Sequence, residues 1–459
     1  MKQTNTNLPV AKGQIVEINI ERLNHDGEGV GKVDGFTVFV PGTAPEDRVS
    51  AKIISLQKTY ARALVQEIIN ESPHRIAPTC AHYDDCGGCQ LQHINYEQQL
   101  VIKRNIVIDA LRRIGGLDVP VHPVLGMAEP WQYRNKAQVP VGMDGTLKAG
   151  FYEKRTHKIV DLDCCHIQHP SNDLVVHAVR AILKKMAIPI YDEKNHTGLI
   201  RHIVVRTSFS TGEILVILVT NGRKLPRQND VVEAIRKNVD KVTGIVQNIN
   251  MKQANVILGN EDILLWGKSY LQESLDGLSF HVSPRSFFQV NTLQTDALYA
   301  KVREYTALTG QETVYDLYCG IGTISLYLSR YAGKVIGVEL VNAAVKDAQK
   351  NAELNGITNV EFHKGAAEQL VPERLKKGAK ADVVIVDPPR KGCDERLLSA
   401  MVSMKTSRIV YVSCNPATLA RDLKYLTGKG YAVTEVQPVD MFPHTSHVET
   451  VVLMSRVKE

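Results

Sequence analysis

The last third of the chain alternates short apolar runs with amphipathic segments, and this alternation limits the possible folds more than any other feature. Continuous apolar runs are typical of strands buried on both faces, and the segments between them carry apolar residues at helical spacing. Strands that alternate with helices form parallel sheets covered by helices. We therefore predict an α/β, Rossmann-like, doubly wound sheet in residues 276–459, with strands in 313–320, 334–340, 359–365, 382–389 and 409–416 and two more after them.

The first of these strands runs into a glycine turn, D-x-x-x-G-x-G, from Asp316 through Gly320 to Gly322. Glycine lets a ligand approach the backbone N–H groups at the beginning of the following helix. Glu339 ends the next strand, 23 residues after Asp316, where a carboxylate can accept hydrogen bonds from both ribose hydroxyls. These features predict an adenosine site. Tyr318 is expected either to line this site or to pack in the core.

NAD and S-adenosylmethionine both contain adenosine, and the glycine turn distinguishes between them. The dinucleotide fingerprint has three spaced glycines around a pyrophosphate, whereas Ser325 stands at the third position here. Asp316 adds a carboxylate where a cationic methionyl group would be favourable. We therefore predict S-adenosylmethionine as the cofactor, with Asp316 and Gly320 in its site.

Two more predicted strands end in reactive residues, D-P-P-R at 387–390 and S-C-N-P at 413–416. Ligand sites of open α/β sheets lie at this end of the strands. The first motif is similar to the loop of amine-directed base methyltransferases, but Arg390 replaces their aromatic residue, which argues against an amine target. Carbon 5 of uracil is a poor nucleophile, and a thiolate that adds to carbon 6 would activate it, a role that suits Cys414. Glu449, in the predicted terminal strand, is the candidate base for the departing C5 proton.

The eight cysteines are too few and too unevenly spaced for a secreted disulfide framework. Cys80, Cys86 and Cys89 supply three thiolates within ten residues, and Cys164 and Cys165 are candidates for a fourth. Four thiolates suit either tetrahedral zinc or a [4Fe–4S] cluster, and the spacing does not choose between them. A radical S-adenosylmethionine enzyme is disfavoured by the fourth cysteine and by the separate adenosine site.

The N-terminal part shows a different pattern. Residues 13–68 contain short alternating runs separated by Gly, Pro and Asp, which predicts a small antiparallel, OB-like barrel in residues 1–68. The glycine-dense segment 27–35 is expected to be a hairpin connection, since no strand-to-helix pattern accompanies it. Residues 96–116 predict a helix that links two parts, and residues 69–275 as a whole predict an α+β central domain.

Five motifs together resemble the RNA (uracil-5) methyltransferase family: SFFQVN (286–291), DLYCGIGT (316–323), DPPRKG (387–392), SCNP (413–416) and DMFPHTSHVE (440–449). The resemblance implies methyl transfer from S-adenosylmethionine to C5 of a uridine in RNA. It implies that Cys414 is the nucleophile, that Glu449 accepts the proton, and that four residues contact the cofactor: Gln289, Tyr318, Glu339 and Asp387. Phe287 or Phe288 is expected to stack near the base or the cofactor, with core packing as the alternative.

The resemblance also bears on the cysteines and on the RNA. The N-terminal barrel resembles a TRAM domain, and family members that modify transfer RNA generally lack both this barrel and the cysteines. The chain therefore resembles the 23S ribosomal RNA enzymes of Gram-positive bacteria, which implies a [4Fe–4S] cluster on Cys80, Cys86, Cys89 and Cys165, with Cys164 as the alternative fourth ligand. The cluster is expected to be structural, with redox sensing as the alternative. Residues 131–136 resemble the family's RNA-facing region, or form a solvated surface strand.

Composition adds a few expectations. The net charge of +6 permits a polyanionic partner, although a mixed-charge surface would give the same total. We find neither a signal-peptide pattern nor an apolar run of about 18 residues, so we expect a cytoplasmic monomer with RNA as its partner, no membrane contact and no obligate protein partner. A transfer RNA uridine methyltransferase, an amine-directed RNA methyltransferase and a non-catalytic RNA-binding iron–sulfur protein remain as alternatives.

Overall fold

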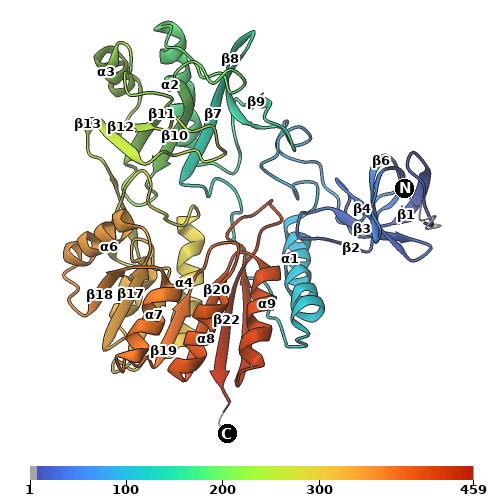
Figure 1. The fold of residues 1–459 in the computed structure, drawn as a ribbon. Coiled ribbons are helices and arrows are strands. Elements are labelled where there is room, and N and C mark those ends of the chain that lie inside the picture. The colour runs from blue at the N-terminus through green and yellow to red at the C-terminus, as the bar shows by residue number, and fades with distance from the viewer. Residues whose placement is uncertain (1–7, 458–459) are drawn as a thin grey trace, which may run out of the picture.

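The structure is a computed structural model that describes residues 8–457. Figure 1 shows three parts: the C-terminal sheet with its helices at the bottom, a central sheet above it, and a small N-terminal β unit to the right. Within the described residues no helix is long and apolar enough to cross a membrane. The three ranges predicted as domains, 1–68, 69–275 and 276–459, remain a prediction.

The N-terminal sheet has the strand order β1-β5-β6-β4-β3-β2 and encloses its own apolar core. Its strands are β1 (Ile15–Asn19), β2 (Arg22–Leu23), β3 (Gly29–Val33), β4 (Phe36–Val40), β5 (Arg48–Leu56) and β6 (Tyr60–Asn70). Buried and exposed residues alternate along β1 and β5, as a sheet with one buried face requires. The sheet is not wholly antiparallel as predicted, because β4 runs parallel to β6.

The glycine-dense segment 27–35 is more than the predicted hairpin connection, because its middle forms β3. A Cβ atom at Gly29 would lie 1.9 Å from the hydroxyl of Thr43, and one at Gly31 would lie 2.3 Å from the side chain of Ile18. These two glycines therefore allow close packing within a strand and are not there only for turns.

The predicted linking helix is present as α1 (Tyr96–Ala110), extended by a π-helical turn (Leu111–Gly115). The side chain of Asn95 caps its beginning by accepting a hydrogen bond from the backbone of Gln98, and Gly116 ends it with a φ of 66°. Val107 and Leu111 pack in the core of the C-terminal sheet, and α1 lies beside α9 in Figure 1. The linking segment is thus part of the C-terminal core.

The central part is α+β, as predicted. Its sheet has the order β13-β12-β11-β10-β7-β8-β9, and α2 and α3 pack on it through a shared core. The elements are β7 (Lys136–Asp144), β8 (Thr146–Tyr152), β9 (Ile159–Asp161), α2 (Pro170–Lys185), β10 (Ile200–Thr207), β11 (Ile214–Thr220), α3 (Gln228–Asn238), β12 (Val242–Ile249) and β13 (Glu261–Gly267). A hairpin of β14 (Leu271–Leu275) and β15 (Leu278–Val282) leads from this sheet into the C-terminal part.

The C-terminal sheet has the order β18-β17-β16-β19-β20-β22-β21, in which the first five strands are parallel and β22 runs antiparallel to β20 and β21. Its strands are β16 (Thr313–Leu317), β17 (Lys334–Glu339), β18 (Val360–Lys364), β19 (Val383–Val386), β20 (Arg408–Ser413), β21 (Tyr431–Val439) and β22 (Glu449–Arg456). Its helices are α4 (Thr292–Thr306), α5 (Thr323–Ser329), α6 (Asn342–Leu354), α7 (Ala367–Lys376), α8 (Glu395–Met404) and α9 (Pro416–Thr427).

This sheet is covered on both faces, which confirms the predicted Rossmann-like fold. Alternate residues of β19 belong to different cores: Val383 and Ile385 pack with α4, α5 and α6, while Val384 and Val386 pack with α7, α8 and α9. Both faces are therefore buried, and the strands read as continuous apolar runs in the sequence.

Candidate active site

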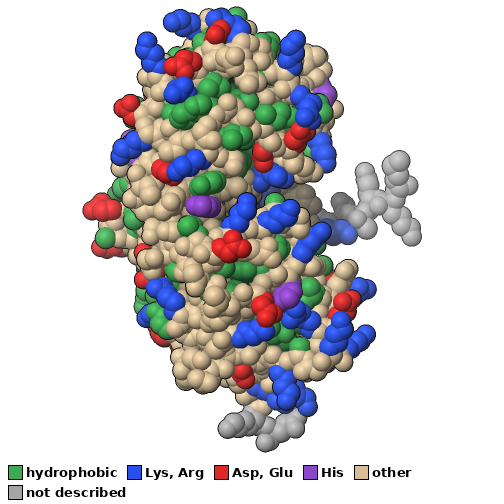
Figure 2. Space-filling view, turned by 90° about the vertical axis from the view of Figure 1, so that its left-hand side faces the viewer, with side chains coloured by type: hydrophobic (Ala, Val, Ile, Leu, Met, Phe, Trp, Pro, Cys, Tyr) green, Lys and Arg blue, Asp and Glu red, His purple; other side chains and the backbone are tan. Residues whose placement is uncertain are grey.

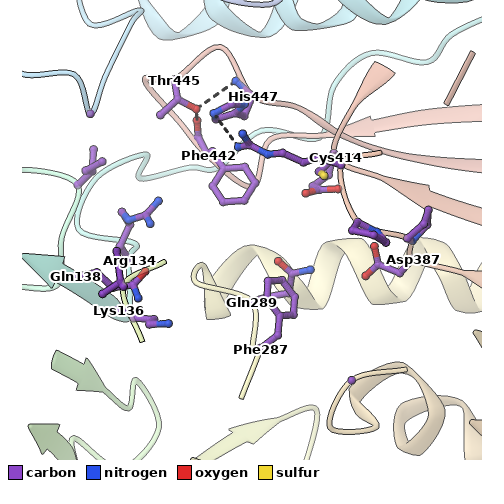
Figure 3. A pocket seen from close by; sticks show the side chains of 18 of the residues that line it. Arg134, Lys136, Gln138, Phe287, Gln289, Asp387, Cys414, Phe442, Thr445 and His447 are labelled. Atoms are coloured by element: carbon purple, nitrogen blue, oxygen red, sulfur yellow. Dashed lines mark hydrogen bonds between the residues drawn. The ribbon is translucent and has the colours of Figure 1, made fainter. Parts of the chain in front are cut away.

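A cavity of about 940 Å³ lies where the carboxyl ends of the parallel strands face β7 and the cysteine-rich loop. Figure 3 shows Cys414 and Asp387 on one side of this cavity and Arg134, Lys136 and Gln138 on the other. Nearly all of the predicted site residues line it: Cys80, Cys86, Cys89, Cys164, Cys165, Gln289, Tyr318, Gly320, Glu339, Asp387, Cys414 and Glu449.

The glycine turn after β16 forms one wall. Tyr318, Gly320 and Gly322 have φ angles of 68°, 56° and 83°, so three residues of the turn have left-handed backbone. A Cβ at Gly322 would lie 2.6 Å from the ring of Phe362, while one at Gly320 would meet nothing within 4 Å. Glu339 accepts hydrogen bonds from the backbone N–H groups of Gly320 at 3.1 Å and of Val341 at 2.7 Å. Its carboxylate is thus held against the turn at the end of β17.

Asp316 is the one predicted cofactor residue that does not line the cavity, and its side chain is buried. The hydroxyl of Ser325 donates a hydrogen bond to its Oδ2 at 2.5 Å, and its Oδ1 is buried without a partner among residues 8–457. Burial raises the pKa of Asp316 to about 6. Ser325, which stands in place of a third glycine, therefore holds this carboxylate beneath the turn.

The pairing of β20 with β22 brings Cys414 and Glu449 to the same edge of the sheet. Ser413 is opposite Thr450, so the residue after Ser413 and the residue before Thr450 are neighbours. Asp387 directly follows β19, the strand beside β20. The terminal strand begins at Glu449, and residues 440–448 before it form a loop.

The electrostatics of this edge are dominated by anionic groups. Burial raises the pKa of Glu449 to about 8, and the charge of Asp387 contributes. Burial also raises the pKa of Asp387 to about 7 and that of the Cys414 thiol to about 11, and Glu449 and Asp387 add to the rise at Cys414. Arg390 acts in the opposite direction on Glu449 and Cys414. Positive charge brought into the cavity would therefore favour the ionised forms of all three groups.

Several lining residues were not assigned a role from the sequence. Arg390 lies 3.4 Å from the ring nitrogen of His447, and the backbone of His447 donates a hydrogen bond to the Thr445 hydroxyl at 3.3 Å. Thr445 and His447 belong to the loop between β21 and β22, which also contributes Phe442 to the lining. The motif DMFPHTSHVE contained these residues, but only their position after folding distinguishes them.

The two phenylalanines of the SFFQVN segment lie in different places, one at the cavity and the other in the core. Phe287 lines the cavity and is 66% exposed, whereas Phe288 is buried in the core. The side chain of Asn135 donates a hydrogen bond to the backbone carbonyl of Gln289 at 2.9 Å. The central part thereby fixes the Gln289 backbone at the cavity.

Five cysteines line the wall formed by the central part. Cys89 is buried, Cys80, Cys86 and Cys165 are half-buried, and Cys164 is exposed. Burial raises the pKa of Cys89 to about 11, and the charges of Cys86 and Cys80 add to this rise. Within residues 8–457, however, no group of three or more His, Cys, Asp or Glu side chains is arranged so that it could hold a metal ion. The structure gathers the predicted ligands without showing a metal site.

The fold and the glycine turn together define the class. A doubly wound sheet whose first strand ends in such a turn, with an acidic residue at the end of the second strand, is the architecture of Rossmann-like methyltransferases that use S-adenosylmethionine. The tRNA (uracil-5-)-methyltransferase family matches residues 172–457, and the TRAM domain family matches residues 9–65. The chain therefore belongs to the RNA uracil-5 methyltransferase family and carries an N-terminal TRAM domain, as the sequence motifs predicted.

Similar proteins agree with this assignment. The chain is 50% identical to an uncharacterized RNA methyltransferase of Halalkalibacterium halodurans, covering 97% of this chain and 98% of that protein. It is 49% identical to an uncharacterized RNA methyltransferase of Listeria innocua, with the same coverage. The tRNA (uracil-54, C5)-methyltransferase of Pyrococcus abyssi, solved in complex with S-adenosyl-L-homocysteine, is 31% identical, has a TM-score of 0.76, and covers 95% of this chain and 99% of its own. The chain is an S-adenosylmethionine-dependent RNA (uracil-5-)-methyltransferase.

Proposed function

We propose that this enzyme methylates C5 of a uridine in 23S ribosomal RNA, with Cys414 as a covalent nucleophile and Glu449 as the base. The observation that carries the proposal is the register of β20 against β22, which brings the thiol and the carboxyl together at the cavity that the glycine turn also lines.

The cofactor residues follow from the same cavity. Gln289, Tyr318, Gly320, Glu339 and Asp387 line it and are the proposed contacts of S-adenosylmethionine. When bound, the cofactor supplies the methyl group and a positive sulfonium beside the anionic edge of the sheet. We assign Asp316 a supporting role beneath the turn, because it is covered and already bonded to Ser325.

The residues of the chain then act on the base in order. The Cys414 thiolate adds to C6 of the uracil, and the C5–C6 electron pair moves toward C5 and O4. Carbon 5 uses this electron density to form its bond to the methyl carbon, and the bond from that carbon to the sulfonium sulfur would break with its electron pair left on the sulfur. Glu449 removes the C5 proton, the C5–C6 double bond returns, and the sulfur of Cys414 leaves with the electron pair of the C6–S bond. Arg390, whose charge lowers the pKa of Cys414, favours the thiolate.

We also propose that Cys80, Cys86, Cys89 and Cys165 hold a [4Fe–4S] cluster. Four thiols on one cavity wall are the donor set that such a cluster takes. A cluster separates its thiolates more widely than a single ion does, so its ligands do not need the close convergence that is absent here. Bound there, it would tie the loop at 80–89 to residue 165. Iron and sulfide content of the anaerobically purified chain, compared between Cys165→Ser and Cys164→Ser, tests both the cluster and the choice of fourth ligand.

Transfer RNA is the second candidate substrate, and the Pyrococcus abyssi relative, which is named for position 54 of tRNA, favours it. The resemblance of the cysteine set to the ribosomal enzymes favours 23S RNA instead. The TRAM domain does not separate the two substrates, because the tRNA enzyme covers 95% of this chain. Labelled methyl transfer to unmodified 23S RNA and to unmodified tRNA, with identification of the product nucleoside by mass, separates the two. We expect 5-methyluridine in 23S RNA. Methylation of tRNA alone would replace the proposed substrate, and an N-methylated base would refute the proposed chemistry.

A further inference from the structure

The loop between β21 and β22, which leads directly into Glu449, is tied to the cysteine-rich loop by hydrogen bonds that the methyl-transfer steps do not use. The backbone N–H groups of Gln90 and Leu91 both donate to the carbonyl oxygen of His444, each at 3.0 Å. Further along, the backbone N–H of Ser446 donates to the side-chain oxygen of Gln90 at 3.4 Å. Gln90 therefore contacts this loop at two points, and the second lies three residues before Glu449.

The side chain of Gln90 joins two loops that are far apart in the sequence. Its amide N–H donates to the carbonyl of Gly87 at 3.0 Å, while its oxygen accepts from Ser446. An amide is suited to such a link, because it can donate and accept at the same time. Gly87 directly follows Cys86, and Gln90 directly follows Cys89. The segment that carries two of the proposed cluster ligands is thus bonded to the loop in front of β22.

His444 has a backbone conformation that depends on its surroundings. Its φ of 66° lies in the left-handed region, which a residue with a Cβ seldom adopts unless tertiary contacts hold it. Its carbonyl accepts the two hydrogen bonds from the cysteine-rich loop, and its own N–H donates to the side-chain oxygen of Gln99 at 3.0 Å. The turn at His444 sets the direction in which the chain continues to Glu449. The contacts with Gln90 therefore bear on where the carboxyl of Glu449 lies.

The N-terminal β unit packs on the same place. Gly27 is buried and has a φ of 77°, and a Cβ there would lie 3.0 Å from the Cβ of Gln90 and 3.5 Å from the Cβ of Ser446. The absence of a side chain at Gly27 allows this close approach to both residues. We refer to these three residues, one from each of three segments, as the junction.

The junction lies on the side of the N-terminal β unit, at right in Figure 1. Figure 2 views the molecule from the opposite side, where the surface is hollowed at mid-height and Lys and Arg side chains lie beside the hollow. Cations of this kind make the phosphate contacts that dominate RNA affinity. The junction residues carry no charge, so a neutral substitution at Gln90 leaves this positive surface as it is, and we expect RNA affinity to be retained.

We propose that Gln90 is a positioning residue for methyl transfer, which holds the loop between β21 and β22 so that the carboxyl of Glu449 stays beside Cys414. The proposal rests on the proposed function, in which Glu449 removes the C5 proton after Cys414 has added to C6. A displaced Glu449 slows proton removal and leaves the earlier addition intact, so the methylated adduct accumulates. The cysteine-rich loop thereby serves a reaction without a redox step, by supporting the loop that leads to the base.

The test compares Gln90→Met with Gln311→Met. The first keeps the length of the side chain and removes both of its hydrogen bonds. The second is the same change at an exposed residue before β16, at the end of the sheet away from the cavity. Turnover of unmodified 23S RNA and the covalent protein–RNA adduct on denaturing gels are measured together. We expect Gln90→Met to lower kcat about ten-fold, the effect of losing about one hydrogen bond, to keep KM for RNA within about two-fold, and to raise the fraction of enzyme held as adduct. Gln311→Met should change none of these.

The adduct fraction separates positioning from a loss of folded protein. A folding defect lowers turnover and adduct together, whereas a misplaced base lowers turnover and raises the adduct. Iron content per chain, measured on the same anaerobically purified samples, should be equal in Gln90→Met and the unmodified chain. An adduct fraction equal to that of the unmodified chain, or an adduct that appears only with a loss of iron, would overturn the role of Gln90.

Gly27→Ala tests the junction from the N-terminal unit and decides the question if Gln90→Met does not fold. Its matched control is Gly35→Ala, because Gly35 has a φ of 80° and a Cβ there would meet nothing within 4 Å. Both variants strain the backbone, but only the methyl group at Gly27 presses on Gln90. We expect the adduct fraction to rise in Gly27→Ala alone, and equal adduct fractions in the two variants would refute the proposal. The proposed function fails separately, if the unmodified chain forms no 5-methyluridine.

Discussion

Replacing Lys103 by Met removes the cation from a fully buried ion pair that anchors the loop in front of Glu449. Lys103 Nζ lies 2.5 Å from Asp440 Oδ1, and both side chains are 0% exposed. Lys103 also donates to the carbonyl of Phe442 at 3.0 Å. Without Lys103, Asp440 keeps two donors, the Tyr96 hydroxyl at 3.0 Å and the backbone of Phe442 at 3.2 Å. The variant thus leaves a buried carboxylate that is partly satisfied but has no counter-charge.

The magnitude follows from these contacts. Removing one partner of a buried pair costs about 3–5 kcal/mol, and the two remaining hydrogen bonds offset part of it at about 1 kcal/mol each, so we expect a loss of about 1–3 kcal/mol in the free energy of unfolding. Lys103→Met/Asp440→Leu, which removes both charges, should recover most of this loss. Arg112→Met is the matched control, because it breaks an ion pair with Asp118 whose side chains are 62% and 82% exposed, and should cost less than about 1 kcal/mol.

Urea unfolding followed by circular dichroism and by tryptophan fluorescence measures the effect. Trp131 stacks on His444 of the same loop with ring centroids 3.6 Å apart, so in a Trp266→Phe background its fluorescence reports on the loop itself. We expect methyl transfer by Lys103→Met to fall with the loop signal, because Glu449 follows this loop. If Lys103→Met unfolds within 1 kcal/mol of the unmodified chain, as Arg112→Met should, the reasoning about the buried pair is wrong.

Four further predictions concern the site. Cys414→Ala should abolish methyl transfer and the covalent adduct with 5-fluorouridine RNA while keeping RNA affinity within about two-fold by filter binding, and residual turnover would contradict a covalent mechanism. Because burial raises the pKa of Glu449 to about 8 and a base acts in its ionised form, kcat/KM should rise with pH through about 8; a profile that falls over this range would refute the role. Glu449→Gln should speed alkylation of Cys414 at pH 8, because the charge that raises the thiol pKa is gone, and should accumulate the RNA adduct on denaturing gels. Asp422→Ala should lower the free energy of unfolding in urea by about 1–3 kcal/mol and reduce turnover, because Asp422 accepts hydrogen bonds from the Tyr411 hydroxyl and from the backbone of Cys393 in the loop after Arg390. Unchanged turnover would show that this loop does not need the anchor.

The positions of the catalytic groups were partly accessible from the sequence. Cys414 and Asp387 end strands of a parallel sheet, and such ends share one edge, so motif and periodicity together were sufficient to group them. Glu449 is different, because a terminal strand can add to either side of a sheet in either direction. Only the antiparallel register Ser413↔Thr450 makes it the neighbour of Cys414.

Local patterns and motif chemistry therefore determined the elements, the Rossmann-like class, the glycine turn and the choice of S-adenosylmethionine, since these depend on neighbours along the chain. Tertiary structure alone decided that α1 packs in the C-terminal core, that Asp316 lies covered beneath the turn, and that Phe287 rather than Phe288 faces the cavity. It also decided that Arg134 and Lys136 lie across the cavity from Cys414. The reason is physical. Burial, charge pairing and the set of residues that line a cavity depend on contacts between residues hundreds of positions apart, and no local pattern in the sequence specifies those contacts.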